Sequence, residues 1–472
     1  STTMHFMPGC EILQSFDLVH WEHATYVYET LDHTDAQQLK SGQNIYGQGM
    51  WAASLRYHEG RFYICFVAND TRKTYLYTSE KIDGPWKKQL IEGFYHDGSL
   101  LFDEDGRNYI VYGNDEIWIT ELNEDLTAPK KDGLHRLLVS DHKNPELGYE
   151  GSHIQKINGY YYIFLIHSLR DRWMRTEACF YSDSLEGEFT GGDVLCDDRG
   201  YCGQGVAQGG IVDTPDGKWY AMLFQDSGAV GRLPILLPVT WKDHFPVFGQ
   251  NGHVPEEIEV HSTRPGYIYQ PLVGSDDFCN GLLPRWQFNH DPDPRYYHLD
   301  ALQGTYTITT REVCTELTQA VNTLTQRMSY PSCAAEVTVD ASALKEGDVA
   351  GLCAFQGCYA AVGITKHHGK YEVLMLDKKE DGILDMTEGT VVESHQMDFR
   401  FEADFCNMKD EARCYYRVNK GDWLPIGTVH KLYFKLDHFT GCRFGLFCYA
   451  AEETGGSACF RDFKYYDVDE IS

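Results

Sequence analysis

Four versions of one segment decide the fold: YHEGRFYICF (57–66), DEDGRNYIVYG (103–113), KINGYYYIFL (156–165) and TPDGKWYAML (214–223). In each version a glycine turn leads into an aromatic strand, and the turn glycines lie 46, 53 and 58 residues apart. This spacing matches one four-stranded blade per repeat of a β-propeller. An outer-edge sequence also recurs, as SFDLVHW (15–21), TSEKIDGPW (78–86) and YSDSLEGEF (181–189). Its first copy precedes the first glycine turn and belongs to an earlier blade, so the sequence predicts five blades.

The chain changes character near residue 260. After RPGYIYQPLVGS (264–275), strands such as AAEVTVDA (334–341) and CFRDFKYYD (459–467) alternate apolar and polar residues. This alternation is typical of a sheet with one buried face. We therefore predict an all-β chain with three parts: a five-bladed β-propeller over 1–260 whose first blade is incomplete, a linker over 261–274, and a β-sandwich over 275–472.

Composition argues against two classes of partner. The formal net charge is −29, and phosphate binding needs clustered Lys and Arg, so we expect no nucleic acid partner. The chain has no apolar run long enough to cross a membrane, so we expect no membrane partner either. A neutral sugar is compatible with an acidic surface, and 14% of the residues are aromatic side chains, which suit stacking on sugar rings.

The cysteines indicate a reducing compartment. The chain has 15 of them, an odd number, and they lie in apolar strand-like runs without a CxxC pair. We therefore expect buried free thiols. The sequence as given contains no signal peptide, which predicts a cytoplasmic protein; a secreted protein whose signal peptide has been removed is the alternative.

The repeat register selects four residues with distinctive chemistry. Counting back nine positions from each turn glycine gives Trp51, Asp97, Glu150 and Gln208. Residues at the same place in rotationally related blades point the same way, so we expect the two carboxylates to converge on the propeller axis. Two converging carboxylates are the geometry of an active site.

Six motifs, in order along the chain, resemble glycoside hydrolase family 43. They are SFDLVHWE (15–22), MWAASLRYHEGRFYI (50–64), YHDGSLLFDEDGRNYIVYG (95–113), GYEGSHIQKINGYYYIF (148–164), GVAQGGIVDTPDGKWYAMLFQD (205–226) and GRLPILLPVTW (231–241). The resemblance is to the β-xylosidase and α-L-arabinofuranosidase branch, which carries an appended β-sandwich. The segment DDFCNGLLPRWQFNHDP (276–292) is similar to the opening of that sandwich, so the resemblance covers nearly the whole chain.

The resemblance implies an exo-acting glycosidase that removes terminal β-D-xylose or α-L-arabinofuranose from plant hemicellulose oligosaccharides with inversion. Glu150, in YEGSH, matches the family's general acid. Asp97, in YHDGS, matches the aspartate that orients the acid and tunes its pKa through its like charge. Inversion needs a protonated carboxyl at the leaving oxygen and a carboxylate roughly 6.5–9.5 Å away that activates water.

Five further residues are candidates for substrate binding. Arg232, in GRLP, matches a family arginine that reaches the active site, with a surface arginine as the alternative. Trp51 and Phe6 form an apolar platform against the sugar ring, or else are core residues. Gln208 stands where many relatives carry a His–Gln pair that helps to hold an axial calcium or water, but VAQGG lacks the histidine. His153 either faces the axis or is a buried, hydrogen-bonded histidine. We expect no required cofactor, and a structural calcium is the alternative.

The family's general base has no match in the sequence. In the family it is an aspartate in an Asp-Pro motif on the inner strand of blade one, and the segment that should follow it begins here at Ser1. Glu11, Asp17 and Glu22 do not lie in an Asp-Pro context. Three explanations are open: a late start of the reading frame, a natural truncation that keeps sugar binding, or another carboxylate as base. Because an incomplete blade leaves unpaired backbone groups, we expect a homo-oligomer through it.

Two functions follow from these observations. One is an exo-acting pentosidase, and the other is a non-catalytic sugar-binding propeller, which the missing base favours. They differ in whether Glu150→Gln abolishes turnover or changes only affinity. In both cases the expected partner is a pentose-containing oligosaccharide, and the preference for xylose or arabinose depends on loops that build the pocket.

Overall fold

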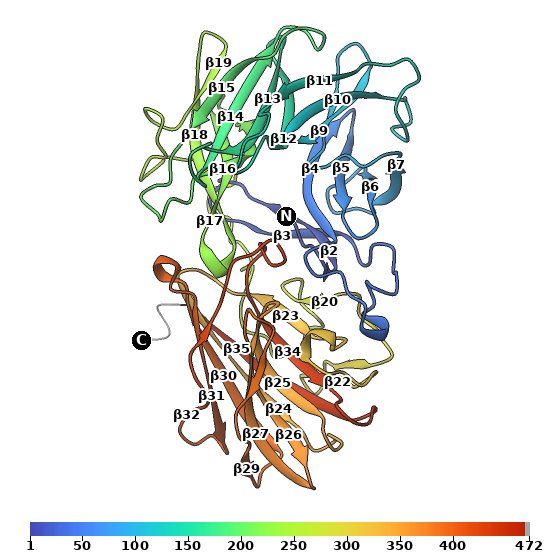
Figure 1. Ribbon diagram of the computed structural model, residues 1–472, viewed down its shortest axis with the longest axis vertical. Coiled ribbons are helices and arrows are strands. Elements are labelled where there is room, and N and C mark those ends of the chain that lie inside the picture. The colour runs from blue at the N-terminus through green and yellow to red at the C-terminus, as the bar shows by residue number, and fades with distance from the viewer. Residues whose placement is uncertain (468–472) are drawn as a thin grey trace.

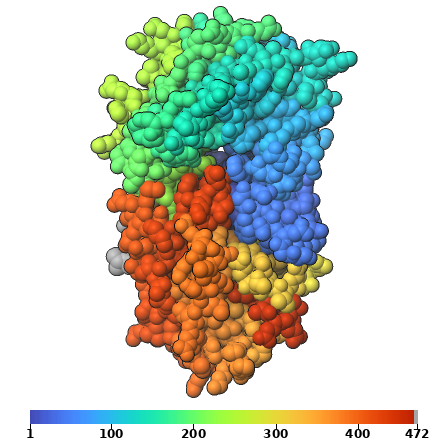
Figure 2. All heavy atoms as spheres, in the orientation of Figure 1, coloured from blue at the N-terminus to red at the C-terminus, as the bar shows by residue number. Residues whose placement is uncertain are grey.

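The structure is a computed structural model that describes residues 1–467. A propeller and a β-sandwich are stacked end to end, and the two halves meet across the middle of the molecule (Figures 1 and 2). The last residues of the predicted sandwich, 468–472, lie outside the described part. Within residues 1–467 the helices are four short 3-10 turns: η1 (Lys40–Gly42), η2 (Gly228–Val230), η3 (Leu317–Gln319) and η4 (Cys406–Met408).

Four antiparallel sheets of four strands each form blades of the propeller. In chain order their strands are β4 (Met50–His58), β5 (Arg61–Ala68), β6 (Lys73–Ser79) and β7 (Lys87–Ile91); β8 (Ser99–Phe102), β9 (Asn108–Asn114), β10 (Glu116–Leu122) and β11 (His135–Ser140); β12 (Glu150–Ile157), β13 (Tyr160–Ser168), β14 (Arg175–Ser182) and β15 (Thr190–Leu195); β16 (Ala207–Asp213), β17 (Trp219–Asp226), β18 (Arg232–Lys242) and β19 (Phe245–Phe248). The first strands of neighbouring blades lie next to one another, which places them around the axis.

The recurring glycine turn joins the first two strands of each blade, as the sequence predicts. The four turn glycines have φ between +77° and +86°, a left-handed conformation that glycine adopts without a steric penalty. The aromatic strand that follows is the second strand, and its side chains pack against the next blade. Tyr109 and Ile163 share one buried cluster, and Phe164 and Leu223 share the next. The aromatic residues of the repeat therefore hold neighbouring blades together.

The sequence predicts five blades, but the structure has four blades, each of four strands. The region of the predicted incomplete blade forms a two-stranded sheet, β2 (Gly9–Gln14) and β3 (Glu22–Tyr28). This sheet packs against the blade β4–β7 through a shared apolar cluster that includes Ile12, Tyr28 and Phe66. The outer-edge sequence 15–21 connects β2 to β3, just as residues 80–86 connect β6 to β7.

The C-terminal half consists of two large antiparallel sheets that enclose one apolar core. The first contains β1 (Phe6–Met7), β20 (Gln287–Asn289), β23 (Leu324–Arg327), β34 (Arg443–Tyr449), β25 (Val349–Phe355), β26 (Ala360–His367), β27 (Lys370–Lys378), β28 (Leu384–Met386) and β29 (Thr390–Val392). The second contains β21 (Tyr297–Asp300), β22 (Thr305–Thr309), β35 (Ser457–Asp467), β24 (Ser332–Asp340), β30 (Gln396–Asp404), β31 (Glu411–Val418), β32 (Leu424–Pro425) and β33 (His430–Lys431).

The N-terminal segment departs from the predicted division at residue 260. Strand β1 pairs with β20 and so extends a sheet of the sandwich rather than a propeller blade. Two residues before β1, Met4 bridges to Met50 at the start of β4. The segment thus ties the two halves together. Two propeller residues of η2, Ala229 and Val230, also belong to the apolar core of the sandwich.

All 15 cysteines lie within the described residues and are unpaired, as predicted. Ten of them are buried. No helix among residues 1–467 has the length and apolar character needed to span a bilayer.

Candidate active site

Three of the four first strands keep the register that counting from the turn glycines predicts, and β12 departs from it by one residue. The strands β4, β12 and β16 each carry an irregularity at one height, directly after Met50, Glu150 and Ala207. In the blade β8–β11 the Gly113 N–H donates to the carbonyl of His96, which places His96 at that height. Glu150 is therefore the counterpart of His96, and Gly151 is the counterpart of Asp97. The count is one residue out in this blade because β12 has one residue fewer than β4 between the irregularity and the same two-residue turn.

Asp97 and Glu150 nevertheless meet, because they occupy adjacent positions on adjacent blades. Asp97 has a left-handed backbone with φ +48°, is 7% exposed, and accepts the Gly151 N–H at Oδ2 over 3.1 Å. Glu150 is partly exposed, and its Oε2 accepts the Asn114 amide at 2.7 Å. His96 lies between them, with Nε2 3.7 Å from Asp97 Oδ2 and 3.7 Å from Glu150 Oε2. One buried carboxylate thus supports a more open one.

The electrostatics of this group follow from burial and from three neighbouring charges. Burial raises the pKa of Asp97 to about 6; the positive charge of His96 opposes this rise, and the carboxylate of Glu150 adds to it. Burial alone would lower the pKa of His96, but the nearby carboxylates of Glu150 and Asp97 raise the pKa above its ordinary value. Asp97 therefore changes charge near pH 6, close to the pH at which a neighbouring carboxylate can influence proton transfer.

Aromatic rings and an arginine close the site on the sandwich side. The ring of Trp51 lies 6.1 Å from that of His96 and 5.7 Å from that of Phe439, measured between centroids. The guanidinium of Arg232 stands 4.3 Å from the ring centres of both Phe224 and Phe439. Its charge also acts to lower the pKa of Asp97, and its Nε pairs with Asp226 at 3.2 Å. The structure thus brings Trp51 and Arg232 to the site and adds Phe439 from the sandwich.

Gln208 and His153 line a small axial cavity beneath the carboxylates. Both contribute to its wall together with Asp97 and Ser54. Burial and the nearby Arg56 charge lower the pKa of His153 to about 3, so its imidazole is neutral. Gln208 has φ +59°, and its N–H donates to the fully buried Glu177 at 2.7 Å.

This donor set does not fit the calcium that the resemblance suggests. Calcium takes six to eight oxygen ligands and prefers carboxylates. The cavity offers a neutral imidazole, one amide and the hydroxyls of Ser54 and Ser152, and its carboxylate, Asp97, already accepts the Gly151 N–H. A Cβ on Gly151 would lie 2.6 Å from Gln208 Nε2, so the Gln208 side chain also fills part of the space. No chemical step below depends on a metal.

Phe6 does not lie with the other predicted residues. Its side chain is fully buried in an apolar cluster of the sandwich, and the guanidinium of Arg443 stands 3.6 Å from its ring centre. The platform role predicted for Phe6 is therefore not supported, and its alternative as a core residue describes it. The reason is the position of β1, which turns this segment into the sandwich sheet.

The sequence analysis does not identify three residues of the site: His96, Asn114 and Phe439. His96 could have been predicted from its position in YHDGS, because a histidine directly before a candidate catalytic carboxylate is a candidate partner for it. Asn114 ends β9 and reaches Glu150 only through the pairing of blade strands. Phe439 lies more than 200 residues beyond the other site residues, in a loop of the sandwich, and no local pattern indicates that it contacts Arg232.

Comparison with known proteins identifies the family. Residues 1–246 match Glycosyl hydrolases family 43, and residues 275–466 match the Beta xylosidase C-terminal Concanavalin A-like domain. The chain belongs to glycosyl hydrolase family 43. It is therefore a glycosidase by family, with the sandwich that accompanies the β-xylosidase branch.

Several relatives match along nearly the whole chain. A β-xylosidase of Formosa agariphila is 25% identical, over 99% of this chain and 85% of its own length. A non-reducing end α-L-arabinofuranosidase of Bacteroides ovatus, BoGH43B, is 23% identical, over 82% of this chain and 75% of its own length. Among solved structures, a bifunctional GH43-CE protein of Bacteroides eggerthii superposes with a TM-score of 0.91 at 41% identity. The match covers 99% of this chain and 60% of the Bacteroides eggerthii chain.

Proposed function

We propose that this protein is an exo-acting, inverting glycosidase that removes terminal β-D-xylose or α-L-arabinofuranose from plant hemicellulose oligosaccharides. The observation that carries the proposal is the pairing of the buried Asp97 with the more open Glu150 on adjacent blades. Relatives named β-xylosidase and α-L-arabinofuranosidase support the pentose substrate. The partner is thus a neutral saccharide, which suits a chain with a formal charge of −29.

In this proposal Glu150 is the general acid that protonates the leaving oxygen. Its carboxyl is partly exposed and is oriented by the Asn114 amide, so it can reach a bound substrate. Asp97 holds the Gly151 N–H beside Glu150 and carries the like charge that tunes proton transfer. Arg232, fixed between Phe224 and Phe439, binds sugar hydroxyls with its forked donors. Trp51 supplies an apolar face to the sugar ring.

The general base belongs to a fifth blade in this proposal. Inversion requires a second carboxylate on the opposite face of the sugar. The sheet β2–β3 is joined through residues 15–21, in the way that β6 is joined to β7, so we infer that it is the outer half of that blade. By the family resemblance, the base lies on the blade's inner strand, and we assign none of residues 1–467 to the role. The predicted oligomer through this blade, and the cytoplasmic location, stay predictions.

The stereochemistry of the product tests the reaction class. A nitrophenyl pentoside would be hydrolysed in an NMR tube, and the first anomer formed would be observed before mutarotation. Two forms would be compared: the present chain and a form extended with an Asp-Pro-bearing first strand. Inversion of the anomeric configuration is expected; the loss of rate in Glu150→Gln is measured on oligosaccharides, whose leaving oxygen needs protonation, because nitrophenolate leaves with little help from a general acid. Retention would contradict the proposed mechanism.

The alternative, a non-catalytic sugar-binding propeller, predicts a different outcome of the same experiment. Neither form would release product, while a pentose oligosaccharide would still bind, and Glu150→Gln would change only affinity.

A further inference from the structure

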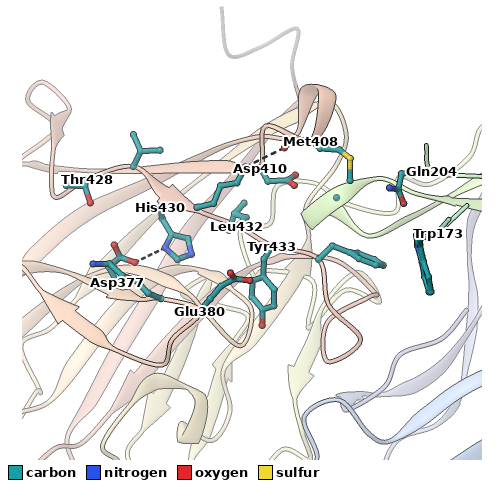
Figure 3. Close-up of a pocket in the computed structure, with 15 residues that line it drawn as sticks. Trp173, Gln204, Asp377, Glu380, Met408, Asp410, Thr428, His430, Leu432 and Tyr433 are labelled. Atoms are coloured by element: carbon teal, nitrogen blue, oxygen red, sulfur yellow. Dashed lines mark hydrogen bonds and ion pairs between the residues drawn. The ribbon is translucent and has the colours of Figure 1, made fainter. Parts of the chain in front are cut away.

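A second cavity, apart from the small axial one, lies where the propeller meets the sandwich. It has a volume of about 780 Å³, which lies within the usual range of ligand-binding pockets. Figure 3 shows Trp173 and Gln204 on the propeller side, opposite Asp410, Tyr433 and Glu380 of the sandwich. Both halves of the molecule therefore build this pocket, which we call the interdomain pocket.

The propeller wall of the interdomain pocket lies at the same end of the blades as Glu150. Glu150 starts β12 and pairs with Ile166, which is close to the end of β13. The chain then forms the loop 169–174, and Trp173 lies in this loop. Gln204, which precedes β16, and Gly228, which follows β17, belong to the corresponding end of the next blade. The pocket and the catalytic carboxylates thus open on one face of the propeller.

Trp173 has the features of a platform for a sugar ring. Its side chain is 45% exposed, although a large aromatic residue is ordinarily buried. Arg175 supports it from within, with the guanidinium 5.1 Å from the ring centre. Arg175 in turn pairs with Asp226 at 2.7 Å, and Asp226 holds Arg232. A short chain of contacts therefore connects Trp173 to Arg232, whose charge acts on the pKa of Asp97.

The sandwich wall supplies acceptors for hydroxyl groups. Asp410 and Glu380 line the pocket, and one oxygen of Asp410 accepts the Ala229 N–H at 3.1 Å. Asp377 is paired with His430 at 2.8 Å. The two lysines of the wall, Lys379 and Lys431, are paired with neighbouring groups of the sandwich. A wall of this kind disfavours an anion and suits a neutral polyhydroxyl ligand.

We propose that the interdomain pocket binds the leaving-group part of a neutral pentose-containing saccharide, with Trp173 as its stacking platform. The inference rests on the proposed function, because it takes Glu150 as the acid. A general acid protonates the leaving oxygen, so the leaving saccharide must extend away from Glu150 on that side. The blade of Glu150 is the blade whose loop carries Trp173. The sandwich then serves to hold the main chain of the substrate.

The test compares one short and one long substrate in the wild type and in Trp173→Ala. We expect the variant to lose about tenfold in affinity for xylohexaose, measured by calorimetry, because a central aromatic anchor carries at least this much. Its kcat/KM for oligosaccharides should fall by a similar factor, while kcat/KM for a nitrophenyl pentoside changes less than about threefold. Tyr57→Ala removes another exposed aromatic residue, distant from the pocket lining, and serves as the matched control.

Two more variants keep the test decisive. Trp173→Phe retains a ring and should keep most of the affinity, which excludes misfolding as the cause of the loss. Glu380→Gln changes only the sandwich wall. It should weaken the binding of xylohexaose but leave kcat/KM for the nitrophenyl pentoside unchanged. Equal behaviour of wild type and Trp173→Ala on both substrates would overturn the pocket proposal and leave the proposed function standing. A wild type that neither binds nor cleaves any pentoside would overturn both.

Discussion

Burial of Asp97 beside Glu150 destabilises the fold and at the same time strengthens the influence of Asp97 on Glu150. Asp97 is almost fully buried, and its carboxylate has one backbone donor and a histidine at 3.7 Å as its polar neighbours. A carboxylate in such a place is costly while ionised, which is why burial raises its pKa to about 6. The same burial keeps its charge close to Glu150 and weakly screened by water. We infer that the site retains Asp97 for this influence despite its cost.

Replacing Asp97 with Asn should therefore stabilise the fold and damage the enzyme. The folded pKa of about 6 exceeds the unfolded value of 3.8, so ionised Asp97 destabilises the protein above pH 6, and this cost vanishes as the pH falls through 6 toward 3.8. Asp97→Asn should raise the free energy of unfolding by about 1–3 kcal/mol at pH 7 and leave it unchanged near pH 3.5. Urea unfolding at the two pH values measures the difference. Equal stabilisation at both would show that charge burial is not the cause.

The sequence predicts part of this site and misses the rest for a physical reason. Asp97 and Glu150 are identified because glycine turns mark the blades, although β12 is one residue shorter than β4 before the turn, which shifts the count for Glu150 by one residue. Arg232 is identified through its motif. Phe439 is not, because its contact with Arg232 depends on how two halves of the chain dock. Local patterns contain no information about such contacts.

At the scale of elements, the connection between β3 and β4 and the loop before β34 meet in a cluster of histidines. His5, His290 and His438 are fully buried, with ring centres 4.9 Å apart for His5 and His290, and 5.5 Å apart for His5 and His438. Tyr46 packs against all three rings. His290 accepts the Ile45 N–H, so its imidazole is neutral. The cluster lies where the propeller contacts the sandwich.

Charged groups around this cluster oppose its protonation. Burial lowers the pKa of His290 to about 3 and that of His438 to about 4, and burial together with the neighbouring histidines lowers the pKa of His5. The Arg443 charge acts in the same direction on His5 and His438, while Asp437 partly opposes it at His438. Because His438 precedes Phe439 in one loop, the state of the cluster also bears on the active site.

We expect this cluster to make the protein acid-sensitive. His290 and His438 are protonated below pH 6.5 in the unfolded chain but stay neutral in the folded protein until about pH 3 and about pH 4, so stability falls as the pH drops across this window. The lowered pKa of His5 acts in the same direction. The slope should be about 1.4 kcal/mol per pH unit for each histidine. His438→Gln should reduce the slope of unfolding free energy between pH 6 and 4.5 by this amount. His20→Gln, at an exposed position, is the control, and an unchanged slope in His438→Gln would refute the expectation.

At the scale of the whole molecule, the propeller and sandwich share structure and do not behave as separable modules. Strand β1 belongs to the sandwich sheet, and Phe6 to its core. In return Ala229 and Val230 of the propeller complete the large sandwich core. Tyr46, from the connection to β4, donates to the Thr318 carbonyl at 2.7 Å. The alternating strands after residue 275 predict the sandwich, but two residues at the N-terminus carry no pattern that would predict their place in it.

This interlocking predicts that a fragment of residues 1–274 is much less stable than the full chain. Without the sandwich, β1 has no partner strand, and the buried rings of His5 and Phe6 become exposed to water. Each large apolar side chain that loses its burial should lower the free energy of unfolding by about 2 kcal/mol, so the total loss should be several kcal/mol. Urea unfolding followed by tryptophan fluorescence would compare the fragment with the full chain. A fragment with the same unfolding midpoint as the full chain would contradict a shared structure.

The most direct test of the central claim is pentose release from short arabinoxylan oligosaccharides. It compares the present chain, the form extended with an Asp-Pro-bearing first strand, and Glu150→Gln in each. The account predicts that arabinose or xylose is released by at least one of the two forms, and that Glu150→Gln lowers the rate in that form by at least about 100-fold. Release by the extended form alone would place the base on the added strand. Release that persists in Glu150→Gln, or no release by either form, would contradict the claim that Asp97 and Glu150 form a glycosidase centre.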